Sequence, residues 1–419
     1  MLHQGPCNRM ISMDPWKALK KQALSFSRCK TQPKPSLLSS SQITLDYTKQ
    51  NISPQTRALL FELAETRQVK QKVDALFSGH IVNTTENRPA LHWALRANAG
   101  ETLQVNQSNV MLEIQNTLTR MRDISEQIRE KTWLGYSGKP ITDVVNLGIG
   151  GSYLGPFFCL HALRDLKLPT LNYHFISDFD PFAFTHATKN LNPETTLFIV
   201  SSKSFTTAET LYNLDKAIHW INQPDALTQH LIAVTASPEK ATALGIQHIL
   251  PMWDWVGGRY SVCSAINLIT CIAVGFDAFQ ALLDGAASMD AHFRDAPLEQ
   301  NLPINLALLG IWTNNFLNIH QLLLLTYAQP LDYFTDYVQQ LDMESNGKGM
   351  TPHGKPVDYA TGPIVWGGSG NQAQHSYYQL LSQGTHAIAA DLISVDTYEQ
   401  SPMHQLCMAQ KEALSALDS

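Results

Sequence analysis

Residues 339–348, with the sequence QQLDMESNGK, bring carboxylates, amides and a lysine together beside a glycine. Glu344 of this segment and His375, further along the chain, are our leading candidates for an acid–base pair. A carboxylate and an imidazole can divide the proton transfers of a reaction at neutral pH when both face one substrate. The alternative interpretation of the segment is the start of a helix, capped by Asp342 or Ser345.

Two polar loops have the composition of a phosphate site. Residues 148–153, GIGGSY, contain Gly151 and Ser152, and residues 201–207, SSKSFTT, contain five hydroxyl residues and one lysine. Glycines let the backbone approach a ligand, hydroxyls donate hydrogen bonds, and the start of a helix carries positive potential. The first loop is not a dinucleotide fingerprint, because Tyr153 replaces the third glycine, and it lacks the ending of a Walker loop. Helix capping is the alternative role for the hydroxyls.

Arg259 lies in the segment WDWVGGRYS, residues 253–261, where two glycines give it a tight turn. A guanidinium in such a place can stabilise a developing oxyanion. A structural salt bridge with Asp254 is the alternative. An upstream group of polar side chains fits a solvated helix face as well as a functional role; its members are Glu86, Arg88, His92 and Arg96.

Several short apolar runs are bounded by turn residues and separated by helical patterns. They are residues 143–147, 173–176, 196–200 and 231–234. This pattern is typical of a parallel sheet that is covered on both faces, and it predicts an α/β doubly wound domain. Ligands of such sheets lie beyond the carboxyl ends of the strands, where both polar loops are expected.

The rest of the chain suggests two further units. Residues 14–115 are rich in helical patterns, including a helix that begins with Ser53 as cap and Pro54 at its first position. The apolar run 306–327 is interrupted by amides and a histidine, so we expect a buried helix and no membrane span. A polar connection at 284–303 marks a boundary. We therefore expect a helical N-terminal segment (1–115), a first α/β domain (116–285) and a second α/β domain (286–419).

The composition is that of a globular enzyme-sized protein. Hydrophobic residues make up 44% and charged residues 16%, which excludes disordered and coiled-coil classes. A net charge of -6 argues against a nucleic-acid surface. The six cysteines form no CxxC pair, so we expect no zinc site, no disulfide framework and a reducing cytoplasm. Residues 1–13 lack an apolar signal core and contain further methionines, which suggests an upstream extension and a later translation start.

Taken in order, these segments resemble the glucose-6-phosphate isomerase family. The resemblance begins at residues 45–49, LDYTK, includes NRPALHWALR at 87–96, and continues to residues 379–381. WDWVGGRYS and QQLDMESNGK are its most specific parts. The resemblance implies two tandem sugar-isomerase (SIS) domains, and reversible conversion of glucose 6-phosphate to fructose 6-phosphate in glycolysis and gluconeogenesis. It implies neither a metal nor an organic cofactor.

The resemblance also implies roles for individual residues. Glu344 is the base that moves a proton between C1 and C2 through an enediol, Arg259 stabilises the enediolate, His375 assists ring opening, and Gln340 contacts the sugar. The phosphate is held by Ser152, Ser202, Ser204 and Thr207, with Gly151, Lys203 and Thr206 adjoining. Active sites of the family combine residues from two subunits, so a homodimer is implied.

The chain departs from the family pattern in two places. Cys263, Asn267 and residues 368–373 differ from the usual neighbours of the site. The family also continues well beyond the segment equivalent to 403–417, where it completes the second sheet and supplies a catalytic lysine that Lys411 does not match. We therefore expect an incomplete second domain and little isomerase activity. The alternatives are a sugar-phosphate-binding regulator, a catalytically dead interaction protein on the same fold, and a Rossmann dehydrogenase.

Overall fold

The computed structural model describes residues 14–24, 36–97, 100–105, 108–395 and 401–416. The expected upstream extension and later translation start concern residues 1–13, which lie outside these ranges. Cys7 and Cys29 lie outside them as well. Among the described residues, no helix has the length and apolar character needed to cross a membrane.

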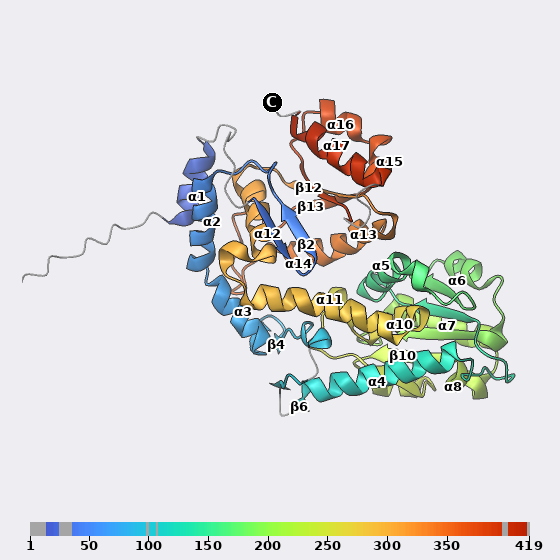
Figure 1. The fold of residues 1–419 in the computed structure, drawn as a ribbon. Helices are drawn as coiled ribbons and strands as arrows, with labels where there is room; N and C mark the ends of the chain where they lie inside the picture. The colour runs from blue at the N-terminus through green and yellow to red at the C-terminus, as the bar shows by residue number, and fades with distance from the viewer. Residues whose placement is uncertain (1–13, 25–35, 98–99, 106–107, 396–400, 417–419) are drawn as a thin grey trace, which may run out of the picture.

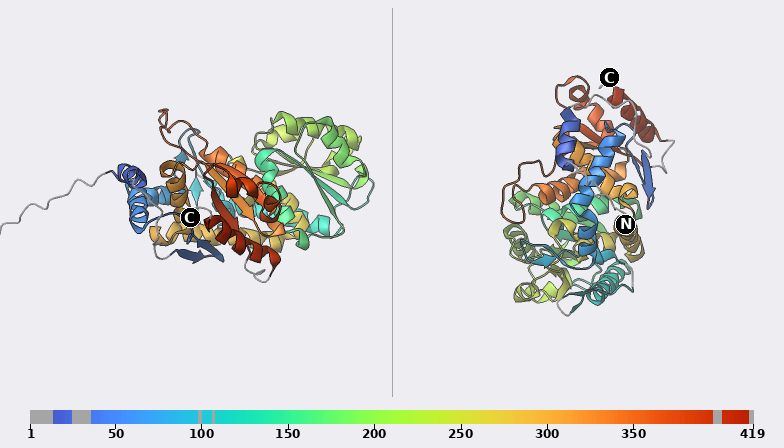
Figure 2. Two further views of the ribbon diagram at one scale, coloured as in Figure 1. Left: turned by 90° about the horizontal axis from the view of Figure 1, so that it is seen from above. Right: turned by 90° about the vertical axis from the view of Figure 1, so that its left-hand side faces the viewer.

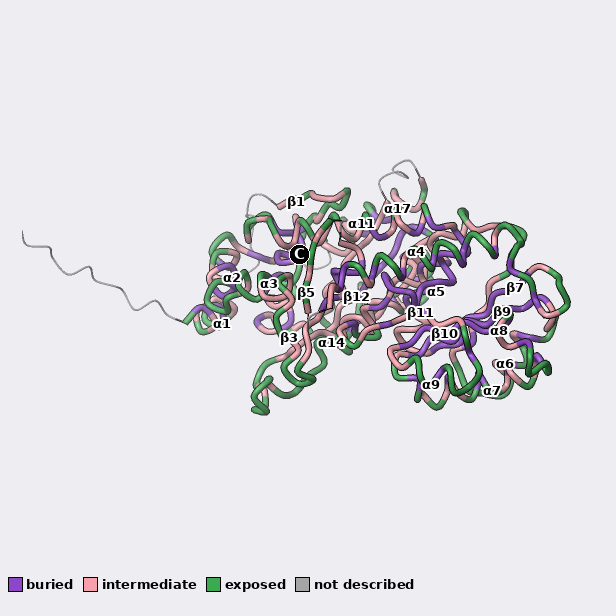
Figure 3. Tube along the Cα trace, turned by 90° about the horizontal axis from the view of Figure 1, so that it is seen from below, coloured by how far each residue is buried: buried purple, intermediate pink, exposed green. Residues whose placement is uncertain are grey.

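The larger of two parallel sheets lies in the middle of the chain. Its strands are β7 (Asp143–Leu147), β8 (Asn172–Ile176), β9 (Thr196–Ser201), β10 (Leu231–Thr235) and β11 (His248–Pro251). Their spatial order is β11-β10-β9-β7-β8. The runs predicted for β7 to β10 are confirmed as strands, whereas β11, an edge strand of four residues, was not predicted. Every residue of β7, β9 and β10 is buried, which explains why these strands are continuous apolar runs (Figure 3).

Helices cover both faces of this sheet (Figure 1). One face packs against α4 (Val110–Arg129), α5 (Leu154–Ala162), α10 (Leu268–Val274) and α11 (Phe276–Asp295). The other packs against α6 (Pro181–Thr188), α7 (Ala208–Ile221), α8 (Leu227–His230) and α9 (Pro238–Ala243). Successive side chains of a strand enter opposite cores, as Val144 and Val145 do. The doubly wound prediction is thus confirmed.

The second sheet is also parallel, with the order β13-β12-β14. Its strands are β12 (Gln321–Thr326), β13 (Ile364–Ser369) and β14 (Ala389–Ile393). The helices of this part are α13 (Phe334–Val338), α14 (Glu344–Asn346), α15 (Gly370–Gln374), α16 (Tyr378–Gln383) and α17 (Pro402–Ala416). The prediction of a second α/β unit is therefore confirmed.

Two expectations for the middle of the chain are wrong. The run 306–327 is not one buried helix: α12 (Leu302–Ile311) continues as a π-helical turn to Phe316, and β12 follows. Asn318 has a φ of 58°, a left-handed conformation that ends the helical stretch. The expected polar connection at 284–303 is also largely absent, because α11 continues through it to Asp295.

The N-terminal helices are α1 (Pro15–Leu24), α2 (Pro54–Thr66) and α3 (Val69–Phe77). As predicted, Ser53 caps α2, accepting a hydrogen bond from the backbone N–H of Thr56. This part also contains the unpredicted antiparallel pairs β1 (Leu37–Ser40) with β2 (Ile43–Asp46), β3 (Ile81–Asn83) with β4 (Arg88–Pro89), and β5 (Gln104–Val105) with β6 (Ser108–Asn109).

The N-terminal helices share a hydrophobic core with α12, in which Leu60 of α2 and Leu308 of α12 are buried. The hairpin of β1 and β2 also lies close to α17, the last helix (Figure 2). Lys411 of α17 forms an ion pair with Asp46, and Lys49 forms another with Glu412 at 2.6 Å. The first part of the N-terminal segment, through α2, is therefore built against the second half of the chain, whereas Leu91 and Leu95 belong to the core of the larger sheet.

Candidate active site

The glycine loop after β7 lies against the turn that carries Arg259. Residues Gly150–Ser152 form a 3₁₀ turn, in which Gly150 has a φ of +52°. A Cβ atom on Gly151 would lie 2.1 Å from the carbonyl oxygen of Gly258, so the two turns meet backbone to backbone. Only a glycine permits this approach.

The hydroxyl loop follows β9, the neighbour of β7 in the sheet. Ser202 is buried, and its hydroxyl lies 3.3 Å from that of Thr207. The hydroxyl of Thr206 donates to that of Ser204 at 2.8 Å. Thr207 is the N-cap residue of α7, yet its side chain makes no capping hydrogen bond. The capping alternative therefore fails for Thr207.

Lys203 links the hydroxyl loop to the arginine turn. Its ammonium donates to the carbonyl oxygens of Asp254 and Val256, at 2.8 and 2.9 Å. Burial lowers the pKa of the Lys203 ammonium, against the opposing effect of nearby Asp254. The side chain that we expected beside the phosphate is thus bonded to the backbone just ahead of Gly257 and Gly258.

Arg259 and Glu344 form the centre of the site. The Nη1 atom of Arg259 lies 3.1 Å from Oε1 of Glu344, with side-chain exposures of 21% and 53%. The alternative partner of Arg259, Asp254, instead pairs with Arg88 at 3.2 Å. Arg259 and Asp254 therefore do not form the salt bridge that we considered, and that interpretation is wrong.

Glu344 lies near the end of a helical stretch and not at its start. Helix α13 continues as a π-helical turn over residues 339–343 and then as α14, which ends before Gly347. π-helical turns often occur at functional sites. The interpretation of this segment as a capped helix start is therefore wrong. Gln340, in the π turn, reaches the glycine loop, because a Cβ atom on Gly150 would lie 3.0 Å from its Nε2 atom.

His375 lies elsewhere in the fold. It directly follows α15, which begins where β13 ends, and it is exposed. No interaction found within the described ranges joins His375 to Arg259 or Glu344. Lys411, which we did not expect to take the catalytic role, forms an ion pair with Asp46.

Around the arginine of the site lie Tyr260 and Ser345, which we did not predict, and His92 and Arg96 of the polar group noted in the sequence. The hydroxyl groups of Tyr260 and Ser345 are hydrogen-bonded, with their oxygens 2.7 Å apart. The ring of Tyr260 stacks on His92, with the ring centroids 4.7 Å apart. Arg96 pairs with Asp290 through both carboxylate oxygens. Burial, together with the charge of Arg96, lowers the pKa of His92 to about 4. Apart from Asp290, these residues lie within the segments 87–96, 253–261 and 339–348, which carried the family resemblance.

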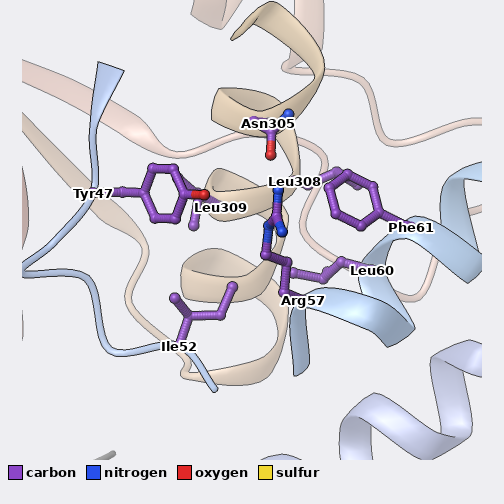
Figure 4. A pocket seen from close by; sticks show the side chains of 8 residues that line it. All are labelled: Tyr47, Ile52, Arg57, Leu60, Phe61, Asn305, Leu308 and Leu309. Carbon is purple, nitrogen blue, oxygen red and sulfur yellow. The ribbon is translucent and has the colours of Figure 1, made fainter. Parts of the chain in front are cut away.

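A small cavity between α2 and α12 is separate from this site (Figure 4). Tyr47, Arg57 and Asn305 point into it, and its volume of about 10 Å³ is close to that of one water position. It is too small for a sugar phosphate. The described residues contain no group of three or more His, Cys, Asp or Glu side chains arranged to hold a metal ion.

The sequence pattern of the family described as phosphoglucose isomerase matches residues 46–417. The chain belongs to the phosphoglucose isomerase family. A glucose-6-phosphate isomerase of Legionella pneumophila (strain Lens) is 52% identical over 373 residues, which are 89% of this chain and 75% of the relative. One of Shewanella pealeana is 44% identical over 418 residues, covering 95% of this chain and 77% of the relative.

Solved structures agree with this phosphoglucose isomerase assignment. The crystal structure of a glucose-6-phosphate isomerase from Chlamydia trachomatis has a TM-score of 0.86 at 28% identity, and the match covers 96% of this chain and 81% of that one. A hypothetical protein from Thermus thermophilus has a TM-score of 0.65 at 24% identity, covering 87% and 84%, and shows the fold alone.

Proposed function

We propose that this chain interconverts glucose 6-phosphate and fructose 6-phosphate through an enediol. The observation that carries the proposal is the Arg259–Glu344 pair, set beside two loops that follow neighbouring parallel strands. The relatives that match most of the chain at 52% and 44% identity bear the name of this activity. Membership in the family supports the reaction, and the local geometry supports the residue roles.

Glu344 is the proposed base. On the open-chain aldose, its carboxylate takes the proton from C2 and delivers it to C1, while the proton of the C2 hydroxyl passes through solvent to the C1 oxygen. The carbonyl thereby moves from C1 to C2, and every atom of the substrate is retained. The negative charge on the enediolate oxygens develops next to the guanidinium of Arg259, which already lies 3.1 Å from the carboxylate. Gln340, above the glycine loop, contacts the sugar hydroxyls.

The two loops are the proposed phosphate site. Ser152 on the first loop, and Ser202, Ser204 and Thr207 on the second, donate to the dianion, with Gly151 and Thr206 adjoining. The hydroxyl of Thr207 makes no capping hydrogen bond to α7 and lies beside that of Ser202 at the start of this helix, where the first N–H groups favour an anion. Lys203 contributes by holding the loop against the arginine turn.

His375 is proposed to assist ring opening from a second copy of the chain. It is exposed, and it follows the strand β13 and helix α15 on a part of the fold that makes no described contact with Arg259. A homodimer would bring the His375 of one copy to the Glu344 of the other. The reaction proposed needs neither metal nor organic cofactor, and a cytoplasmic location belongs to the same proposal.

A coupled assay of fructose 6-phosphate isomerisation tests the function. The parent chain should turn over at a low but measurable rate, in line with the little activity expected for it. Glu344→Gln should lose at least about 100-fold of that rate, and the matched control Glu412→Gln should retain it. Glu412 lies on α17, ion-paired to Lys49. A parent chain that binds sugar phosphates in calorimetry without turnover would instead favour the regulator or the dead interaction protein.

A further inference from the structure

We propose that Ser345 is a positioning residue that holds the guanidinium of Arg259 in the orientation it needs, with Tyr260 as a second anchor. The proposal rests on the proposed function for its effect on turnover. The geometry behind it is a single hydroxyl group that meets three partners. These partners are the Nε–H of Arg259 at 2.7 Å, the hydroxyl of Tyr260 at 2.7 Å, and the carbonyl oxygen of Leu341.

The hydrogen-bonding capacity of a serine hydroxyl fixes the direction of each bond. A serine hydroxyl has one proton to donate and two lone pairs that accept. A carbonyl oxygen only accepts, so the proton of Ser345 goes to Leu341. The Nε–H of Arg259 only donates, so it takes one lone pair. The remaining lone pair accepts from Tyr260, which makes the tyrosine a donor.

A serine that donates to the carbonyl four residues earlier is common in helices and needs no functional explanation. The two bonds that Ser345 accepts are different, because both come from the turn at residues 258–263, which is distant in sequence. The hydroxyl is saturated by groups of the helix and of that turn. It therefore fixes the helix of Glu344 relative to the turn of Arg259.

The guanidinium is planar and rigid, so two fixed hydrogen bonds define its orientation. Ser345 accepts from Nε, and Glu344 faces Nη1 at 3.1 Å. Without Ser345, the long side chain of Arg259 could rotate about its bonds while keeping only the half-exposed contact with Glu344. Fixing the plane also directs the remaining N–H groups, which are the ones available to a substrate oxygen.

The second anchor has a rigid support of its own. The ring of Tyr260 contacts the guanidinium of Arg259, 5.3 Å from the ring centroid, and the imidazole of His92, stacked at 4.7 Å. Arg96, four residues after His92, is ion-paired with Asp290 of α11. The stacking on His92 thus supports the ring that presents the Tyr260 hydroxyl to Ser345.

The test uses three variants beside the parent. Ser345→Ala removes the hydroxyl, Ser345→Thr keeps it, and Tyr260→Phe removes only the second donor. If Ser345 acts through Arg259 on charge in the transition state, Ser345→Ala lowers kcat about tenfold with little change in KM. Ser345→Thr restores kcat, and Tyr260→Phe shows a smaller loss. A structural role alone would not give this split between kcat and KM together with rescue by threonine.

A double-mutant cycle identifies the residue through which Ser345 acts. Arg259→Lys has no Nε–H for Ser345 to hold, so adding Ser345→Ala to it should cost little further activity. Additive losses would show that Ser345 acts elsewhere, and would overturn the proposal. Unchanged kcat in Ser345→Ala of an active parent would overturn it too.

A spectroscopic readout makes the outcome independent of turnover. The Nε–H resonance of Arg259, identified by its loss in Arg259→Lys, should exchange slowly with solvent in the parent and in Ser345→Thr. Ser345→Ala should accelerate this exchange at least about tenfold, as expected for loss of a hydrogen bond to a charged group. Unchanged exchange would overturn the proposal. An inactive parent would refute the proposed function. The exchange rates of the Arg259 Nε–H would then test the positioning role of Ser345 on their own.

Discussion

Gly151→Ala should separate the two turns that form the site. The added Cβ atom would lie 2.1 Å from the carbonyl oxygen of Gly258, 2.3 Å from its carbonyl carbon and 2.7 Å from the amide nitrogen of Arg259. Ordinary contacts between such atoms are about 3.5–4.0 Å, so the turns must part by more than about 1 Å. All three atoms are backbone atoms, and no side-chain rotation can relieve the contact.

The magnitude follows from this displacement. A shift of about 1 Å in a catalytic group can cost about 100-fold in rate, and overpacking typically costs about 1–3 kcal/mol of stability. We expect kcat/KM of Gly151→Ala in the coupled assay to fall about 100-fold. Its thermal midpoint should fall as well.

The matched control lies on the other side of the same contact. A Cβ atom on Gly258 meets nothing within 4 Å, and Gly258 has no positive φ, so Gly258→Ala should change kcat/KM only slightly. The comparison keeps the chemical change and the location constant. Equal activities of the two variants would refute the backbone contact as the feature that sets Arg259 beside the glycine loop.

Three further predictions concern the phosphate site, its support and pH. The double variant Ser204→Ala, Thr207→Ala should weaken sugar-phosphate binding by about 1.5–3 kcal/mol for each lost hydrogen bond, and unchanged affinity in calorimetry would remove both residues from the site. Lys203→Met leaves two carbonyl oxygens without their donor, so the thermal midpoint and kcat should both fall. If only the affinity for sugar phosphate changed, Lys203 would instead be a phosphate ligand. The pKa of His92 is depressed in the fold from 6.5 to about 4. The stability that the neutral imidazole contributes to the folded state is therefore fully present above pH 6.5 and is lost as pH falls toward 4. His92→Gln should remove up to about 3 kcal/mol of that pH dependence from the free energy of unfolding, and an identical pH profile would contradict the buried neutral imidazole.

The strands of the larger sheet were predictable because burial on both faces leaves a clear signal. Thr196–Ser201 is buried at every position, so its sequence is an almost unbroken apolar run between turn residues. The same signal misled the interpretation of residues 306–327. A run of leucines does not distinguish a buried helix from a buried parallel strand, and the change from α12 to β12 depends on the conformation at Asn318.

The candidate site was predictable as a set of segments but not as a set of contacts. The loops after β7 and β9 had to be close, because the carboxyl ends of neighbouring parallel strands meet at one edge of the sheet. The direction of a long side chain is set by tertiary neighbours that spacing does not reveal. Lys203 therefore bonds to the backbone before Gly257, and Arg259 selects Glu344 over the nearby Asp254. Ser345 carries no signal in composition, since its role depends on the turn packed against it.

The most direct test of the account is solvent-proton exchange at C2 of the substrate. The parent chain is incubated with glucose 6-phosphate in D₂O, and deuterium at C2 is measured beside Glu344→Gln. Binding of 1,5-anhydroglucitol 6-phosphate, which cannot open or isomerise, serves as the control for an intact site. We expect deuterium incorporation by the parent and a loss of at least about 100-fold in Glu344→Gln, with the affinity retained. Incorporation by Glu344→Gln at the parental rate would contradict the central claim, because another group would then be the base.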